Sequence, residues 1–244
     1  MRTQKLKSRA EIGRSLKHMY REQDTPNADP ERLNQNNYLN SYRDQDWYKS
    51  LKKLSAAERK EQLRKTGVEH GLQRYDSLLP NKVRKNAVHG IEVLVTASPE
   101  VLQKWPKDKQ LQYFLAAHDW LNKRLSGPGT IIGSAVHNDE TTPHLSVIYM
   151  PLKDGRLNAR HYIGGHRDRM SELQDEFHAE VGHKFALDRG VKRSRARHIS
   201  IREYYGKLVN VMTATRERMN ELSQQRQRKR QQKRRRDLGD DLGW

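Results

Sequence analysis

Short apolar runs along the chain predict the strands of a sheet. The clearest run covers residues 87–97, and two more cover 130–136 and 145–150. Runs of this length that are rich in valine and isoleucine are typical of strands. The polar residues between the last two runs predict a hairpin, and residues 1–6 could add a short edge strand.

Apolar residues spaced three or four apart predict the helices. Residues 8–22 place Ile12, Leu16 and Met19 on one face, so this segment is expected to pack by that face. Residues 23–40 contain two prolines and five asparagines, which favours a long loop or arm. The same spacing and composition predict further helices over residues 44–66 (one polar helix or two short ones), 111–125, 171–181 and 200–232.

The order of these elements, β-α-β-α-β-β-α, favours an α/β (α+β) fold with helices packed on a largely antiparallel central sheet. Beyond Arg189 the composition changes, and residues 226–236 are only Arg, Lys and Gln. Such a run cannot enter a core, so it is a solvated tail or a phosphate-binding arm. We expect a folded domain over residues 1–198 and a basic helical extension over 199–244.

Charge and composition narrow the class of protein. A net charge of +18 and a pI near 10.1 favour a polyanionic partner, most commonly nucleic acid, although ribosomal or membrane-surface binding would give the same balance. The absence of cysteine excludes disulfide scaffolds, thiolate zinc sites and cysteine nucleophiles. With no long apolar run and no signal-peptide pattern, a soluble cytoplasmic protein without membrane insertion is expected.

The residues that carry chemistry gather in the predicted hairpin. From His137 to Ser146 the chain reads His-Asn-Asp-Glu-Thr-Thr-Pro-His-Leu-Ser. Strand side chains alternate between faces, so His144 and Ser146 point the same way, and His137 can face His144 across the hairpin. Two imidazoles beside two carboxylates suit one divalent cation, although a histidine in a polar turn is often only a solvated residue.

A cation in this place, beside a basic surface, suggests phosphodiester chemistry, because a metal ion can polarise a phosphate oxygen. Such chemistry also needs a nucleophile. Spacing alone leaves several possibilities open: water, His18, or one of the tyrosines Tyr20, Tyr38, Tyr42 and Tyr48.

The motif and its surroundings resemble the HUH relaxases of the MobV (Mob/Pre plasmid mobilisation and recombination) family. His137-x-Asp-Glu-x-Thr-Pro-His144 looks like the metal motif of that family. The resemblance extends over roughly residues 1–205 and includes, in the family's order, Gln4-Lys-Leu-Lys with Leu16-Lys-His18-x-x-Arg21, Asn37-Tyr38, Arg84-Lys-Asn-Ala-Val88, Asp154-Gly-Arg156 and Leu173-Gln-Asp-Glu-Phe177.

The resemblance implies an enzyme that cuts one DNA strand at a plasmid transfer origin by transesterification and keeps the 5′ end covalently attached. It implies that His18 is the nucleophile, and that Glu140 and Arg21 take part in catalysis. His137, His144 and Glu140 map onto groups that hold Mn²⁺ or Mg²⁺. The resemblance also implies that Asp139 contacts one of the imidazole ligands and orients it without itself binding the metal.

One position departs from the family pattern. The family has His-x-His on the last strand, whereas this chain has His144-x-Ser146, and a neutral hydroxyl is a weaker ligand than an imidazole. Three outcomes stay open: Ser146 or a water completes the ligand shell, Glu140 does so, or the site has decayed. If Ser146 is a ligand position, Ser146→His should tighten Mn²⁺ binding.

The expected partner is single-stranded or hairpin DNA at the transfer origin. The resemblance also suggests a conjugative coupling protein as a partner and a homodimer through the C-terminal helix. Two other functions stay open: a decayed relaxase that binds the origin without cutting, and a rolling-circle replication initiator with a tyrosine nucleophile. The residues expected to contact DNA are Lys5, Lys7, Arg14, Lys17, Tyr38, Arg84 and Lys85.

Overall fold

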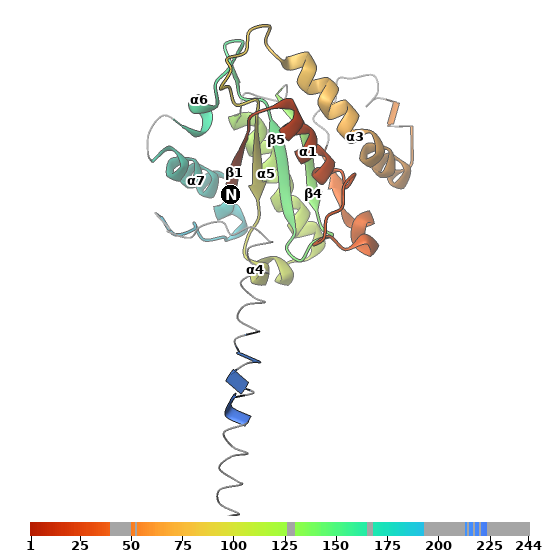
Figure 1. Ribbon diagram of the computed structural model, residues 1–244, viewed down its shortest axis with the longest axis vertical. Helices are drawn as coiled ribbons and strands as arrows, with labels where there is room; N and C mark the ends of the chain where they lie inside the picture. Colours follow the sequence, from red (N-terminus) through yellow and green to blue (C-terminus); the bar gives the residue numbers. More distant parts are fainter. Residues whose placement is uncertain are drawn as a thin grey trace, which may run out of the picture. The chain divides into compact units, whose positions relative to one another are not determined.

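A five-stranded antiparallel sheet forms the centre of the fold (Figure 1). The computed structural model describes residues 1–39, 50–51, 53–125, 130–164 and 168–192, with a few residues between 213 and 223. Neighbouring strands follow the order β1-β3-β5-β4-β2, and all four pairings are antiparallel. The strands are β1 (Arg2–Leu6), β2 (Asn37–Tyr38), β3 (Gly90–Val95), β4 (Ile131–His137) and β5 (His144–Tyr149).

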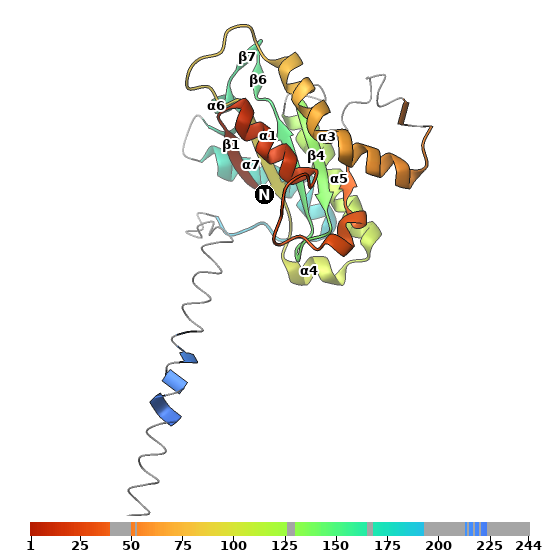
Figure 2. The same cartoon turned by 45° about the vertical axis from the view of Figure 1, so that its right-hand side comes forward.

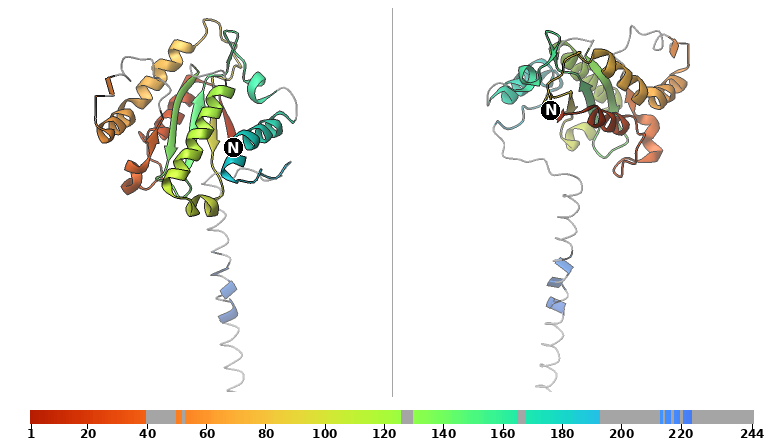
Figure 3. Two further views of the ribbon diagram at one scale, coloured as in Figure 1. Left: turned by 180° about the vertical axis from the view of Figure 1, so that it is seen from behind. Right: turned by 45° about the horizontal axis from the view of Figure 1, so that its top comes forward.

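Helices cover both faces of this sheet. On one face α1 (Arg9–Met19) and α3 (Ala56–Leu78) lie side by side (Figure 2), while α5 (Lys107–Arg124) covers the other, seen from behind in Figure 3. The remaining elements are η1 (Pro30–Gln35), α4 (Pro99–Lys104), β6 (Leu152–Lys153), β7 (Arg156–Leu157), α6 (Ala159–Ile163), α7 (Arg169–Glu180) and η2 (Gly182–Phe185).

Strand alternation divides the core into two layers. Ile91, Val93 and Val95 of β3 point into the layer that α5, α6 and α7 complete. The opposite face packs against α1 and α3, mainly through apolar side chains. On that second face β3 also carries Glu92, which makes the face partly polar where α1 crosses it.

The predicted fold class is confirmed, and the structure corrects several boundaries. Residues 23–40 are more than a loop, because they contain η1 and the edge strand β2, whose Asn37 pairs with Val136. Of the one or two helices predicted over 44–66, the second part belongs to α3, which begins at Ala56 and runs to Leu78, and residues 50 and 51 before it are also helical. A capping box between Ser55 and Glu58 fixes its start, and residues 40–49 lie outside the described part of the chain.

The chain divides into two units, Met1–Lys192 and Arg193–Trp244. The predicted C-terminal helix and the basic run at 226–236 lie almost wholly outside the described residues. Within the described residues, no helix combines the length and the apolar character needed to cross a membrane.

Candidate metal centre

The motif histidines meet at the closed end of the β4–β5 hairpin. His137 ends β4, His144 begins β5, and the two residues are paired in the strand register. Ser146 follows on the same face, one pleat further along β5. Helix α1 crosses this face (Figure 1), and the carbonyl of Met19 at its end contacts the ring of His137.

The outer nitrogens of the two imidazoles bind backbone carbonyls. Nε2 of His137 lies 2.9 Å from the carbonyl oxygen of Met19, and Nδ1 of His144 lies 3.1 Å from that of Thr142. A carbonyl only accepts hydrogen bonds, so each of these nitrogens carries its ring's proton. The inner nitrogens, Nδ1 of His137 and Nε2 of His144, therefore present lone pairs to each other across 3.0 Å.

Facing lone pairs repel unless a cation lies between or beside them. Burial, and next the neighbouring His144, holds the pKa of His137 well below its usual range, so a proton does not fill this role readily. Glu140 completes a group in which one ligand atom of each residue lies within 4.8 Å of the others. Two neutral imidazoles and a carboxylate fit a divalent metal ion.

Arg21 fixes the acidic part of the hairpin. Its guanidinium binds both oxygens of Asp139, at 2.7 and 2.8 Å, and Oε1 of Glu140 at 2.9 Å. Asn27 holds the other oxygen of Glu140 at 2.8 Å. Directly after α1, Arg21 adopts a φ of 57°, which is uncommon for a residue other than glycine and turns the chain toward the hairpin.

Two of the predicted site residues have other hydrogen-bond partners here. Arg21 and Asn36 bind the carboxylate of Asp139, while backbone carbonyls bind the outer nitrogens of both imidazoles. Although burial alone would raise it, the pKa of Asp139 is lowered by those hydrogen bonds. Arg21 was predicted to act in catalysis, yet its side chain is 5% exposed and its donors are engaged. In this structure its guanidinium holds the two acidic residues of the hairpin.

His18 lies beside the imidazole pair. It sits in the last turn of α1, and the centres of its ring and that of His137 are 6.2 Å apart. A cavity of about 170 Å³ is lined by His18 together with His137, His144 and Ser146. Burial, and then the charge of Arg21, lowers the pKa of His18, which favours a neutral imidazole at pH 7.

Glu92 is a site residue that sequence reasoning missed. It lines the same cavity as the imidazoles, and its Oε1 accepts a hydrogen bond of 3.0 Å from Ser146. Its other oxygen accepts one from Ser15 at 3.2 Å. The available signal was a single acidic residue inside the apolar run Gly-Ile-Glu-Val-Leu-Val, where a strand buried on both faces would carry none.

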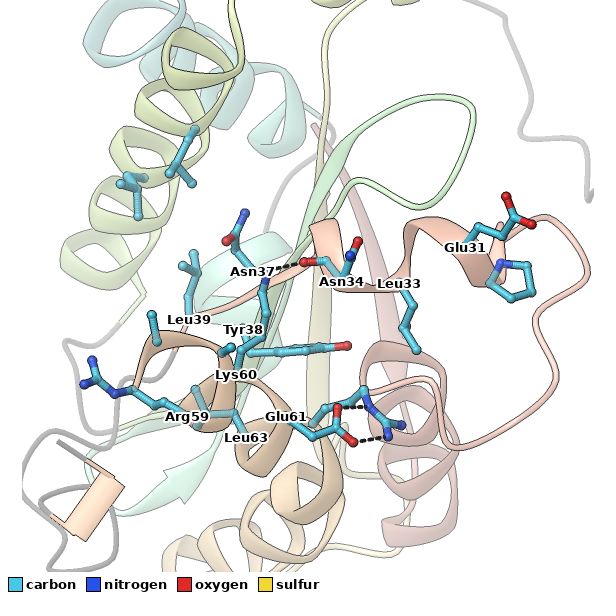
Figure 4. A pocket seen from close by; sticks show the side chains of 16 residues that line it. Glu31, Leu33, Asn34, Asn37, Tyr38, Leu39, Arg59, Lys60, Glu61 and Leu63 are labelled. Atoms are coloured by element: carbon cyan, nitrogen blue, oxygen red, sulfur yellow. Dashed lines mark hydrogen bonds and ion pairs between the residues drawn. The ribbon is translucent and has the colours of Figure 1, made fainter. Parts of the chain in front are cut away.

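The predicted DNA contacts divide into two kinds. Tyr38 is only 8% exposed, and its ring stacks on that of Tyr20 with the ring centres 5.4 Å apart. The face of the Tyr38 ring that contacts Tyr20 therefore cannot stack on a DNA base. The ring borders a groove of about 960 Å³ beside α3 (Figure 4), where Lys60 binds the carbonyl of Asn34. The predicted cations are all exposed: Lys5, Lys7, Arg14, Lys17, Arg84 and Lys85.

The tyrosines are poorly placed as nucleophiles where they are described. Tyr20 is buried, and its burial raises the pKa of its hydroxyl. Burial also raises the pKa of Tyr38 to about 12, so the nucleophilic phenolate is scarce at neutral pH. Tyr42 and Tyr48 lie outside the described residues.

Comparison with known proteins supports the resemblance seen in the motifs. The 65 kDa protein of Zymomonas mobilis is 31% identical over 209 residues, which are 85% of this chain and 32% of that protein. A plasmid recombination enzyme of Bacillus thuringiensis is 34% identical over 130 residues, covering 52% of this chain and 28% of the enzyme. The chain thus spans about a third of the length of the curated relatives it matches.

The fold has a counterpart among solved structures. It is similar to the MobM relaxase domain (MOBV; Mob_Pre) in its Mn-bound structure with plasmid pMV158 oriT DNA, with a TM-score of 0.64 and 24% identity. The match covers 84% of this chain and 97% of that domain. The family model for the plasmid recombination enzyme (Mob_Pre) matches residues 72–206. Because that match takes in more than half of the 244 residues, this chain belongs to the plasmid recombination enzyme (Mob/Pre, MobV) family.

Proposed function

We propose that the chain is a metal-dependent relaxase that nicks and rejoins one DNA strand at a plasmid transfer origin. Membership of the plasmid recombination enzyme family supports this proposal, as does the fold shared with a relaxase domain solved with oriT DNA and Mn. The observation that carries it is the position of His18, which borders the same cavity as the paired imidazoles of His137 and His144.

In the proposed reaction a nitrogen of His18 attacks the phosphorus of the scissile phosphodiester. The N–P bond forms, the P–O3′ bond breaks, and the 3′ oxygen leaves and takes up a proton. The 5′ phosphate stays on the protein as a phosphoramidate, whose bond energy allows the 3′ hydroxyl to attack later and reseal the strand. The lowered pKa of His18 supports this role, because only a neutral imidazole has a lone pair for attack.

The divalent cation, Mn²⁺ or Mg²⁺, would be held by His137, His144 and Glu140, and when bound it supplies charge that polarises a phosphate oxygen. Around it the protein supplies orientation. Met19, the last residue of α1, holds the ring of His137 through its carbonyl. Arg21 binds the carboxylate of Glu140. The chain segment that carries the nucleophile His18 therefore also holds the hairpin, through Met19 and Arg21.

Exposed cations would hold the DNA backbone near the site. Lys17 and Arg14 lie on the same helix as His18, and Lys5 and Lys7 lie on and after β1, the edge strand of the sheet. Contacts to phosphates position DNA without reading its sequence. We assign the relaxase activity to residues 1–198, and to 199–244 non-specific DNA affinity and contacts with a second copy or a coupling protein.

A second function is favoured by one specific observation. Ser146 stands beside His144 where an imidazole would strengthen the metal site, and its hydroxyl is already bound to Glu92. A chain with a weakened metal site could bind the origin without cutting it. In that case binding of origin DNA would persist and no covalent adduct would form.

A nicking assay separates these functions. Single-stranded origin DNA with Mn²⁺ is incubated with the wild type, His18→Ala, and His161→Ala as a control histidine that lies exposed on α6. We expect nicking and a covalent adduct from the wild type and the control, and neither from His18→Ala, with DNA binding retained by all three. Nicking by His18→Ala at the wild-type rate refutes the assigned nucleophile, and binding without nicking by the wild type supports the second function.

A further inference from the structure

Glu92 is an acidic side chain that borders the same cavity as the two imidazoles. Its carboxylate is half-buried and is held by the hydroxyls of Ser15 and Ser146, which are neutral. Within the described ranges no ion pair joins it to a Lys or Arg, although Arg2 and Arg14 line the two cavities that Glu92 borders. A partly buried carboxylate without a cation is costly, since neutral hydroxyls offset only part of its lost hydration.

Glu92 shares one cavity with the two imidazoles, so a cation bound there would contact all three side chains. Glu92 borders the cavity of about 170 Å³ that His137 and His144 also line. Strand register places Leu94 opposite Ser146, so Glu92 is its diagonal neighbour on the same face. The cavity therefore brings two imidazoles and a carboxylate together, and Arg2 lines it as well. Two imidazoles and a carboxylate are donors that suit a divalent cation.

We propose that Glu92 is the third ligand of the metal ion, in the place that an imidazole at position 146 would fill. The inference rests on the metal centre of the proposed function. Glu92 lies outside the close group formed by His137, His144 and Glu140, so ligation requires its carboxylate to turn away from the Ser146 hydroxyl into the cavity. The resulting donors, two imidazoles and two carboxylates, are harder than three imidazoles and suit Mn²⁺ or Mg²⁺.

Calorimetric titration of the full chain with MnCl₂, without DNA, tests the proposal. Glu92→Gln keeps the shape of the side chain, removes its charge and replaces one acceptor oxygen by an amide donor, to which a serine hydroxyl can turn as acceptor. We expect it to weaken Mn²⁺ binding by about tenfold or more, and Ser146→Ala to change the affinity less than about threefold. Glu11→Gln is the matched control, since Glu11 borders the neighbouring groove with His18 and Glu92.

A second background isolates the ligand role. In Ser146→His the new imidazole takes the third position, so adding Glu92→Gln should then cost less than about threefold. Equal Mn²⁺ affinity of the wild type and Glu92→Gln overturns the inference, as does a loss in Ser146→Ala as large as that in Glu92→Gln. Failure of the wild type to bind Mn²⁺ refutes the metal centre itself, and the inference with it. Thermal unfolding of each variant shows whether it is folded.

Discussion

Nδ1 of His137 lies 3.0 Å from Nε2 of His144, while the protonated nitrogens of both rings point outward to backbone carbonyls. The backbone thus selects a different tautomer for each ring. Without those carbonyls either ring could turn its N–H inward and form an ordinary hydrogen bond with the other. The fold thus holds both imidazoles in the tautomers that the proposed metal site requires.

Mn²⁺ should stabilise the folded protein through this pair. An ion present at 100 times its dissociation constant adds about 2.7 kcal/mol to the free energy of unfolding. For a chain of this size, each kcal/mol of added stability raises the melting temperature by about 2–4 °C. Mn²⁺ should therefore raise the melting temperature by several degrees, and EDTA should lower it to its value without metal. Differential scanning calorimetry measures the rise. His137→Ala or His144→Ala should abolish it, and the same rise in His144→Ala would show that the ion binds elsewhere.

Ser146→His should strengthen the metal site. Position 146 shares the face of His144, and its side chain already borders the cavity. An imidazole there would add a stronger donor than the Ser146 hydroxyl, which is bound to Glu92, and we expect Mn²⁺ affinity to rise on the order of tenfold. Titration calorimetry of the variant beside the wild type measures the change. An unchanged affinity would mean that position 146 is not a ligand position.

Loss of Arg21 should destabilise the protein more than loss of an exposed arginine. Arg21→Ala leaves the carboxylate of Asp139, 1% exposed, without its cation, which should cost about 3–5 kcal/mol. Arg9→Ala is the control, because the Arg9–Asp76 pair is about half exposed and such pairs contribute at most about 1 kcal/mol. Urea unfolding measures both, and equal losses in the two variants contradict the clamp assigned to Arg21.

A double variant separates the stability contributed by the Arg21–Asp139 ion pair from other contributions of Arg21. In Arg21→Ala/Asp139→Asn the remaining partner is neutral, so the loss of stability should be clearly smaller than the sum of the two single losses. Additive losses would show that Arg21 stabilises the turn after α1 independently of Asp139.

The sequence predicted the hairpin and its histidines because both depend on local patterns. Strand alternation alone placed His137 opposite His144, and the structure has this pairing in its register. The sequence could not predict the hydrogen-bond partners of Asp139. Asn36 and Arg21 lie more than 100 residues away and reach the hairpin only after the chain has folded. Asn36 was assigned to a loop, yet it is fully buried.

The sequence also did not identify Glu92 as a residue of the site, because strands that are neighbours in this sheet are distant in sequence. Its contact with Ser146 joins β3 to β5 across α4, α5 and β4, and only the strand order brings the two together. The tautomers of the imidazoles were also beyond a sequence argument, because the carbonyl that selects the tautomer of His137 belongs to Met19 at the end of α1.

Two glycines test whether the packing of α1 against α3 controls the site. A Cβ on Gly67 of α3 would lie 2.3 Å from the ring of Tyr20, whereas one on Gly13 of α1 would meet Leu72 at an ordinary 3.9 Å. Gly67→Ala should therefore cost about 1–3 kcal/mol and Gly13→Ala should gain up to about 1 kcal/mol from its helix position. Because Tyr20 lies between Met19 and Arg21, displacing it should also weaken Mn²⁺ binding. Urea unfolding and Mn²⁺ titration of both variants measure these effects, and a Gly67→Ala protein with wild-type stability and affinity would show that the helix packing does not set the metal centre.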